Sequence, residues 1–193
     1  MPKVSAEHRE ARREEILCAA RRRFASEGFH ATSMQDILTE SGLSAGAVYR
    51  YFNSKSDIVS AIACENMSAL LSSLESYADA AADVPVADIV VAVLQQIRNK
   101  HENDRLARLA LQVWAESARD PELRTQFCSS HDRFRAIVRN LVLRRHPDLG
   151  HDADAVAGAI TALVPGFLHQ LALLDPEATA GFETGVRRML DGF

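Results

Sequence analysis

Hydrogen-bond donors and small side chains gather between residues 32 and 55, and their types suit contact with an anion. The donors are Thr32, Ser33, Tyr49, Arg50, Tyr51 and Lys55. Hydroxyl, phenol, guanidinium and ammonium groups bind phosphate oxygens, which gives salt-dependent affinity but little sequence information. The small residues among them, which let a backbone come close to a ligand, are Ser44, Ala45, Gly46 and Ala47. The segment therefore predicts a phosphate-binding surface with a closely approachable backbone.

A second group of residues has the chemistry of metal ligands. His146, His151, Asp152 and Asp154 cluster in an expected polar loop. Their spacing matches no H-E-x-x-H or comparable ligand pattern, and polar loops with His and Asp are common. The seven histidines include none beside a partnered nucleophile. We therefore expect no metal, no cofactor and no catalysis, and a metal-dependent enzyme is the less favoured alternative.

The composition indicates a folded protein with a mildly basic N-terminal part. The chain has 193 residues, of which 47% are hydrophobic and 25% charged, as in globular domains and unlike disordered chains. Residues 1–55 hold nine Lys and Arg against seven Asp and Glu, or +2, whereas residues 56–193 hold thirteen against nineteen, or −6. This asymmetry is expected of a local DNA footprint.

Three features place the chain in the cytoplasm by expectation. The first ten residues contain no apolar signal core. The most apolar stretch, residues 84–94, contains Pro85 and Asp88, so we expect no run near the roughly 18 residues of a membrane span and no membrane contact. Cys18, Cys64 and Cys128 are odd in number and form no C-x-x-C pair, so we interpret them as reduced core residues.

Apolar residues recur at three- and four-residue spacing, which predicts an all-α fold of roughly nine helices. Capping boxes are expected to start two of them, at Ser33 and Ser54, and Gly28 and Gly42 suit left-handed helix ends. We expect the longer helices over residues 7–27, 55–80, 86–101, 104–118, 121–145, 153–174 and 176–191. Pro165, within one of these, is expected to kink it or free a carbonyl.

The short elements within residues 7–52 have the order of a helix-turn-helix. A short helix, a turn around Gly42 and a second short helix form this arrangement, in which the second helix enters a DNA major groove. Its core is expected to contain Phe24, Ile37, Leu38, Leu43, Val48 and Phe52. That packing leaves the residues from Ser44 to Ala47 facing outward.

Two runs of sequence resemble the N-terminal signature of the TetR/AcrR family of bacterial repressors. They are Gly-Phe-His-Ala-Thr-Ser-Met-Gln-Asp-Ile at 28–37 and Ser-Gly-Leu-Ser-Ala-Gly-Ala-Val-Tyr-Arg-Tyr-Phe-Asn-Ser-Lys at 41–55. The resemblance implies an all-α homodimer with two DNA-reading heads on a palindromic double-stranded operator. It also implies a C-terminal domain that binds a small molecule and thereby releases DNA.

The same resemblance assigns roles to individual residues. It implies that Ser44, Ala45, Gly46 and Ala47 approach bases. It implies that the backbone phosphates are held by Thr32, Ser33, Tyr49, Tyr51 and Lys55. Members often carry a longer polar or basic residue where this chain has Ala45, and His where it has Tyr51. Few side chains of this segment can therefore read bases by bidentate hydrogen bonds. The remaining candidates for sequence recognition are thymine-methyl contacts, Arg50 and DNA shape.

We expect a DNA-binding domain over residues 1–53 and an effector-binding and dimerisation domain over residues 54–193. Residues 111–124 also resemble a segment found in one large group of these regulators. The candidates for the effector site are Trp114, His131, Phe134, Phe167 and Gln170. Aromatic walls with a few polar groups are common in small-molecule sites, so we expect a partly apolar effector. The alternative is that these residues belong to the core or its rim.

The last two helices are the expected homodimer interface. Small residues in the first of them permit close helix approach: Ala155, Ala157, Gly158, Ala159 and Ala162. With Phe182, Val186, Met189 and Leu190 of the final helix they predict a two-fold four-helix contact. A helical protein-interaction module, whose N-terminal part binds protein, is the second alternative, and salt-dependent DNA affinity would exclude it.

Overall fold

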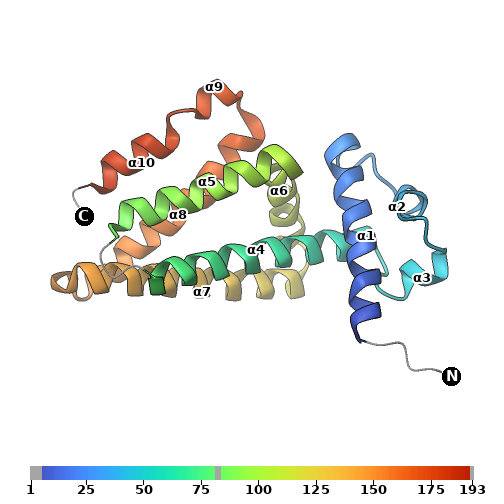
Figure 1. Cartoon of the computed structure of the whole chain (residues 1–193), viewed down its shortest axis with the longest axis horizontal. Helices are drawn as coiled ribbons and strands as arrows, with labels where there is room; N and C mark the ends of the chain where they lie inside the picture. Colours follow the sequence, from blue (N-terminus) through green and yellow to red (C-terminus); the bar gives the residue numbers. More distant parts are fainter. Residues whose placement is uncertain (1–5, 81–83, 192–193) are drawn as a thin grey trace. The chain divides into compact units, whose positions relative to one another are not determined.

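The computed structural model describes residues 6–80 and 84–191, apart from the side chains of residues 78–80. All elements assigned in these residues are helices, which confirms the all-α prediction (Figure 1). Two compact units divide between Glu65 and Asn66, inside helix α4 (Lys55–Ala80), and we call them the head and the body. The expected functional division between residues 53 and 54 stays a prediction. The first five residues, part of the segment expected to lack a signal core, lie outside the described residues.

The head consists of α1 (Ala6–Glu27), α2 (Met34–Ser41), α3 (Ala45–Tyr49) and the first part of α4. α1 packs against α2. Gly28, with φ +84°, ends α1 in the left-handed region, and its N–H donates to the Phe24 carbonyl at 3.0 Å. This is the helix end that the sequence predicts, because glycine adopts positive φ without a Cβ clash.

The body contains the rest of α4 and six further α-helices. They are α5 (Val86–Asp104), α6 (Leu106–Ser117), α7 (Pro121–Arg145), α8 (Asp152–Leu173), α9 (Pro176–Thr179) and α10 (Phe182–Leu190), with a short 3₁₀ helix, η1 (Pro147–Leu149), after α7. α8 packs against both α6 and α7, and α10 packs against α5. The predicted boundaries of α7 are confirmed, and those of α5, α6 and α8 differ by one to three residues. α8 continues through Pro165 as one helix.

The prediction of a single final helix over residues 176–191 is wrong, because the helix is interrupted between α9 and α10. The carbonyl oxygen of Thr179 accepts a hydrogen bond from Arg98 Nη2 at 2.8 Å. That oxygen is therefore directed to a side chain and not to the next turn of a helix. Gly181, at the break, also lowers helix propensity.

The expectation that no stretch comes near a membrane span is also wrong. Within residues 6–80 and 84–191 one helix, α8, is long and apolar enough to cross a membrane by length and composition alone. Part of α8 is buried in the body, including Ala157, Phe167 and Leu171. A core helix of a globular domain passes the same test, so α8 gives only weak support for a membrane segment.

Candidate nucleic-acid interface

Two capped helix starts and one left-handed turn build the helix-turn-helix. Ser33 Oγ accepts from the Asp36 N–H, and an Asp36 oxygen accepts from the Ser33 N–H at 2.7 Å, so the predicted capping box is confirmed. Gly42, with φ +67°, ends α2 and donates to the Leu38 carbonyl at 3.1 Å. Ser44 Oγ then accepts the Ala47 N–H at 3.3 Å and starts α3. Each cap satisfies backbone groups that a short helix leaves free.

An apolar core holds these elements together. Ile37, Val48 and Phe52 are buried, as are Ile16 and Leu17 of α1. Of the predicted core, Leu38 is also buried and Phe24 and Leu43 are half-buried. The packing thus comes largely from the residues that periodicity selects.

The opposite side of α3 is left to solvent. Ser44, Ala45 and Gly46 are exposed, and Ala47 is half-buried. Tyr49 is 46% exposed and Arg50, the residue after the helix, is exposed as well. Ala45 and Gly46 therefore share one accessible face with the hydrogen-bonding side chains of Tyr49 and Arg50.

The predicted phosphate-binding residues lie in different environments. Ser33 is exposed at the start of α2, where its hydroxyl lies 2.6 Å from an Asp36 oxygen. Tyr49 is exposed and Tyr51 is half-buried. Phosphate contacts by these three side chains stay a prediction.

Thr32 and Lys55 face the inside of the head, which the sequence did not predict. Thr32 is 1% exposed, and its hydroxyl donates to the Gly28 carbonyl at 2.9 Å. Lys55 Nζ donates to the carbonyls of Phe29 at 2.6 Å and Thr32 at 2.7 Å, and lies 4.2 Å from the centroid of the Phe29 ring. The ammonium group therefore fixes the turn between α1 and α2 and keeps one of its three N–H groups for another partner. Phosphate contacts by Thr32 and Lys55 stay predictions.

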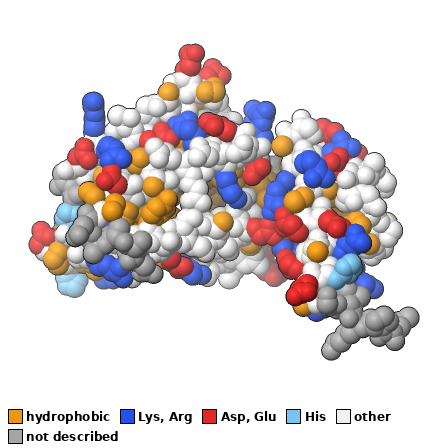
Figure 2. Space-filling view, viewed as in Figure 1, with side chains coloured by type: hydrophobic (Ala, Val, Ile, Leu, Met, Phe, Trp, Pro, Cys, Tyr) orange, Lys and Arg blue, Asp and Glu red, His pale blue; other side chains and the backbone are white. Residues whose placement is uncertain are grey.

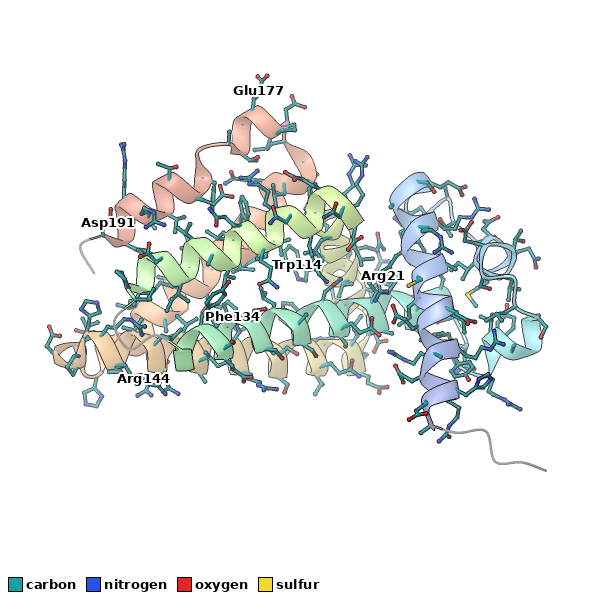
Figure 3. All side chains as sticks on the ribbon, viewed as in Figure 1. Arg21, Trp114, Phe134, Arg144, Glu177 and Asp191 are labelled. Carbon is teal, nitrogen blue, oxygen red and sulfur yellow. The ribbon has the colours of Figure 1, made fainter. Side chains whose placement is uncertain are left out.

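Ion pairs join α1 to α4 within the head. Glu65 accepts from Arg13 Nη1 at 2.6 Å and from Arg21 Nη2, and Arg21 also donates to Glu14 at 2.7 Å. Figure 3 labels Arg21 on α1. Burial alone would raise the pKa of Glu14, but the hydrogen bonds from Arg21 and Cys18 and the nearby positive charge hold that pKa below its ordinary value. No signal in the sequence pairs Glu65 with these arginines, because 44 and 52 residues separate them.

The effector candidates are divided between the core and the surface of the body. Phe134 and Phe167 are buried in one apolar cluster, and Trp114 packs against it. Figure 3 labels Trp114 on α6 and Phe134 on α7. Gln170 is half-buried, whereas His131 is exposed beside Phe127, with ring centroids 6.4 Å apart.

His131 therefore lies on the exposed side of α7, and its role toward a ligand stays a prediction. Phe167 stacks on Phe182 at a centroid distance of 4.6 Å.

In the described part of the chain, no group of three or more His, Cys, Asp or Glu side chains could hold a metal ion.

Two family models match most of the chain. The model described as bacterial regulatory proteins of the tetR family matches residues 16–62. The model described as the C-terminal part of BetI-type transcriptional repressors matches residues 85–193. The first match contains the helix-turn-helix and the second contains α5 to α10.

Individual proteins resemble the chain over nearly its whole length. The HTH-type transcriptional regulator UidR of Escherichia coli (strain K12) is 26% identical over 188 residues, which cover 93% of this chain and 91% of UidR. The structure of Salmonella enterica GusR has a TM-score of 0.71 at 24% identity, over 99% of this chain and 98% of GusR. The structure of SmeT in complex with triclosan has a TM-score of 0.69 at 25% identity, over 93% of this chain and 90% of SmeT.

Proposed function

The chain belongs to the tetR family of bacterial regulatory proteins, and we propose that it is a repressor that leaves a palindromic operator when a small molecule binds its body. The exposed face of α3 is the observation that carries this proposal. Ser44 caps the helix while Ala45 and Gly46 stay exposed, so the backbone can approach base edges. The first helix of such a unit crosses the DNA backbone while the second occupies the major groove.

A homodimer supplies the two heads that a palindrome requires. Six of the exposed residues of α8 follow one stripe at helical spacing, namely Ala155, Ala159, Ala162, Gly166, His169 and Leu173. Leu173 is 61% exposed and Met189 of α10 is 62% exposed. Burial of this apolar surface against a second copy would complete a four-helix contact.

The effector site belongs to the body. SmeT binds triclosan in its solved complex, and this chain places Trp114 beside the cluster of Phe134 and Phe167. We infer a partly apolar effector held by aromatic side chains, with Gln170 as a candidate polar contact. His131, being exposed, would contact such a ligand only at the rim.

Release follows from a shift in population. An effector lowers DNA affinity if it binds more tightly to dimers whose heads do not fit the operator than to dimers whose heads do. That difference in effector affinity is the whole source of the effect. The operator must then lower effector affinity by the same factor. Because it acts on chromosomal DNA, we also propose that the protein works in the cytoplasm and performs no catalysis.

Selection of bound fragments from the host genome, followed by affinity measurements across salt concentrations, tests DNA binding. We expect log affinity to fall linearly with log salt, by roughly 0.9 per phosphate contacted. Ala45→Glu, which adds a negative charge to the exposed face of α3, should abolish binding. Ala136→Glu, the same change on the exposed side of α7, should leave it intact. Equal affinity in the two variants, or no DNA capture at low salt, overturns the proposal.

Sedimentation velocity tests the dimer. The wild type should sediment as a dimer, and Leu173→Glu should shift it toward the monomer because a charge then lies in the apolar contact. Tyr77→Glu, at a side chain 41% exposed on α4, is the matched control and should remain dimeric. A monomeric wild type would remove the basis for a palindromic operator.

A further inference from the structure

Arg50 differs from most cations of the head because nothing in the described residues pairs with it. The arginines of α1 that form ion pairs are Arg12, Arg13, Arg21, Arg22 and Arg23. Lys55 donates to two backbone carbonyls. Figure 2 shows basic and acidic side chains intermixed on the visible face. Within the described part of the head, Arg9 and Arg50 are the cations without such a partner.

The position of Arg50 places this free charge at the end of α3. It is the C-cap residue, with φ −68° and ψ −27°, so the backbone keeps its helical course there. Its side chain is exposed next to Tyr49 on the face that also presents Ala45 and Gly46. The guanidinium is therefore free to contact a partner that lies along α3.

The other residues of α3 leave little capacity to read bases. The Ser44 hydroxyl is used in capping, since it accepts the Ala47 N–H. Ala45 and Gly46 carry no hydrogen-bonding side chain, and Val48 is buried. Tyr49 can donate one hydrogen bond through its phenol. From Ser44 to Arg50 the guanidinium is the one charged group and the one side chain with several donors.

Gly46 adds an independent observation about what approaches this face. Its φ lies outside the left-handed region, and a Cβ added there would meet nothing within 4 Å. Neither the backbone conformation nor packing therefore requires glycine, although glycine weakens a helix relative to alanine. Close approach by another molecule would account for a glycine at this position.

We propose that Arg50 is the residue that determines operator specificity, by reading one guanine in each half-site. This inference rests on the proposed function, because it assumes that α3 lies in the major groove. Guanine presents two adjacent acceptors there, O6 and N7, which match the parallel N–H groups of a guanidinium. Adenine and cytosine present a donor at the corresponding edge, and thymine presents a single acceptor. The small residues that precede Arg50 let α3 lie deep enough for its side chain to reach a base.

The proposal predicts a loss of discrimination and not merely of affinity. A bidentate arginine contact distinguishes the correct base from others by about 5- to 150-fold. Arg50→Ala should remove this factor at one position of each half-site. Arg50→Lys keeps the charge but loses the planar pair of donors, so it should relax the guanine preference with little change in the salt dependence.

Selection from a library of randomised DNA duplexes tests this inference, and it requires no known operator sequence. The full-length wild type, Arg50→Ala, Arg50→Lys and Arg9→Ala would each be selected and their bound sequences compared. Arg9→Ala is the matched control, because it removes the other unpaired arginine of the head from the exposed side of α1. Circular dichroism would establish that all four proteins are equally folded.

We expect the wild type and Arg9→Ala to select one palindromic motif with a guanine at mirrored positions. Both Arg50 variants should select the same motif with those two positions relaxed. If Arg50→Ala keeps the guanines and binds every sequence more weakly by one factor, Arg50 contacts phosphate and the inference is overturned. If the wild type binds DNA but its motif lacks mirrored guanines, the inference alone is overturned. If the wild type captures no DNA, the proposed function fails and this inference fails with it.

Discussion

Arg98 and Glu183 join α5 to α10 through two parallel hydrogen bonds, from Nε to Oε1 at 2.6 Å and from Nη2 to Oε2 at 2.8 Å. The same guanidinium donates to the Thr179 carbonyl at 2.8 Å and lies 5.0 Å from the ring centroid of Phe167. Burial opposes ionisation of Glu183, but the hydrogen bond and charge of Arg98 still hold its pKa below the ordinary value. One side chain thus fixes both C-terminal helices to the core of the body.

Replacing Arg98 by Met is expected to lower the free energy of unfolding by about 2 kcal/mol. The variant keeps an apolar stem near Phe167 but leaves the Glu183 carboxylate and the Thr179 carbonyl without their donor. The side chains of the pair are 20% and 12% exposed, so solvent screens part of the loss. Urea unfolding followed by circular dichroism measures the difference.

Arg187→Met is the matched control on the same pair of helices. Arg187 of α10 pairs with Asp88 of α5, but these side chains are 45% and 38% exposed. Solvated pairs contribute less than about 1 kcal/mol. Equal losses in the Arg98 and Arg187 variants would show that burial of the Arg98 pair adds nothing.

The contribution of Arg98 is also expected to decrease in acid. A glutamate whose pKa is lowered by folding takes up its proton at lower pH than in the unfolded chain. The stabilisation by this pair is therefore complete above the ordinary pKa of 4.5 and is lost as the pH falls through the folded pKa of Glu183. Urea titrations at about pH 6 and about pH 3.5 should show the wild type and Arg98→Met converging in acid. A difference independent of pH would assign the effect of Arg98 to packing and to its hydrogen bond with the Thr179 carbonyl, and not to the pair with Glu183.

Local signals explain why the head could be predicted in detail from the sequence. A capping box acts within one helical turn, so Ser33 with Asp36 and Ser54 with Asp57 identify their helix starts without tertiary information. The signal at Gly42 is equally local, because its positive φ depends only on the helix that it ends. The exposed face of α3 followed from these boundaries and from the apolar spacing.

Contacts between distant residues explain what the sequence did not reveal. α9 ends at Thr179, whose carbonyl is bound by a guanidinium 81 residues earlier in the chain. Lys55 binds carbonyls that lie 23 and 26 residues away in the chain, and the spacing of apolar residues does not predict such a contact. His131 shows a further limit, because it follows Phe127 by one turn yet is exposed on a helix of 25 residues. Spacing identifies a face of a helix but not how far the neighbouring helix covers it.

Stability of the body is expected to fall as the pH drops below neutrality because of His101. Its Nδ1 accepts the Ala107 N–H at 3.1 Å, which requires a neutral imidazole. Desolvation and the charges of Arg105 and Arg108 lower the pKa of His101. The unfolded chain therefore takes up the proton first, and stability is lost as the pH falls through the ordinary histidine pKa of 6.5.

His101→Gln keeps a hydrogen-bond acceptor without the titration. The variant should lose less stability than the wild type between about pH 7.5 and about pH 5.5, measured by urea unfolding. His151→Gln, at an exposed side chain just before α8, should behave like the wild type. Parallel pH dependence in the His101 variant and the wild type would contradict this assignment.

Lys55 is expected to stabilise the head in the absence of DNA. Lys55→Met leaves the carbonyls of Phe29 and Thr32 without their ammonium donor, at a cost of about 1 to 3 kcal/mol. Hydrogen exchange of the α2 amides should therefore accelerate. Lys100→Met, which removes an ammonium that donates to Asn66 in the body at 2.5 Å, should leave α2 unaffected. If Lys55 served phosphate alone, exchange would be unchanged and only the salt dependence of DNA binding would decrease.

Gly46→Ala is expected to raise the stability of the head and lower its affinity for DNA. The added Cβ meets nothing within 4 Å, and alanine favours a helix over glycine by about 0.5 to 1 kcal/mol. The same methyl group separates the backbone of α3 from the base edges. Gly42→Ala should have the opposite effect on stability, because its φ of +67° strains any residue with a Cβ. Thermal unfolding and DNA titration of one preparation measure both quantities. A misfolded variant would lose both stability and DNA affinity. Higher stability together with lower affinity in Gly46→Ala would therefore indicate that DNA approaches the backbone closely. Unchanged affinity in Gly46→Ala would show that the backbone stays clear of the bases.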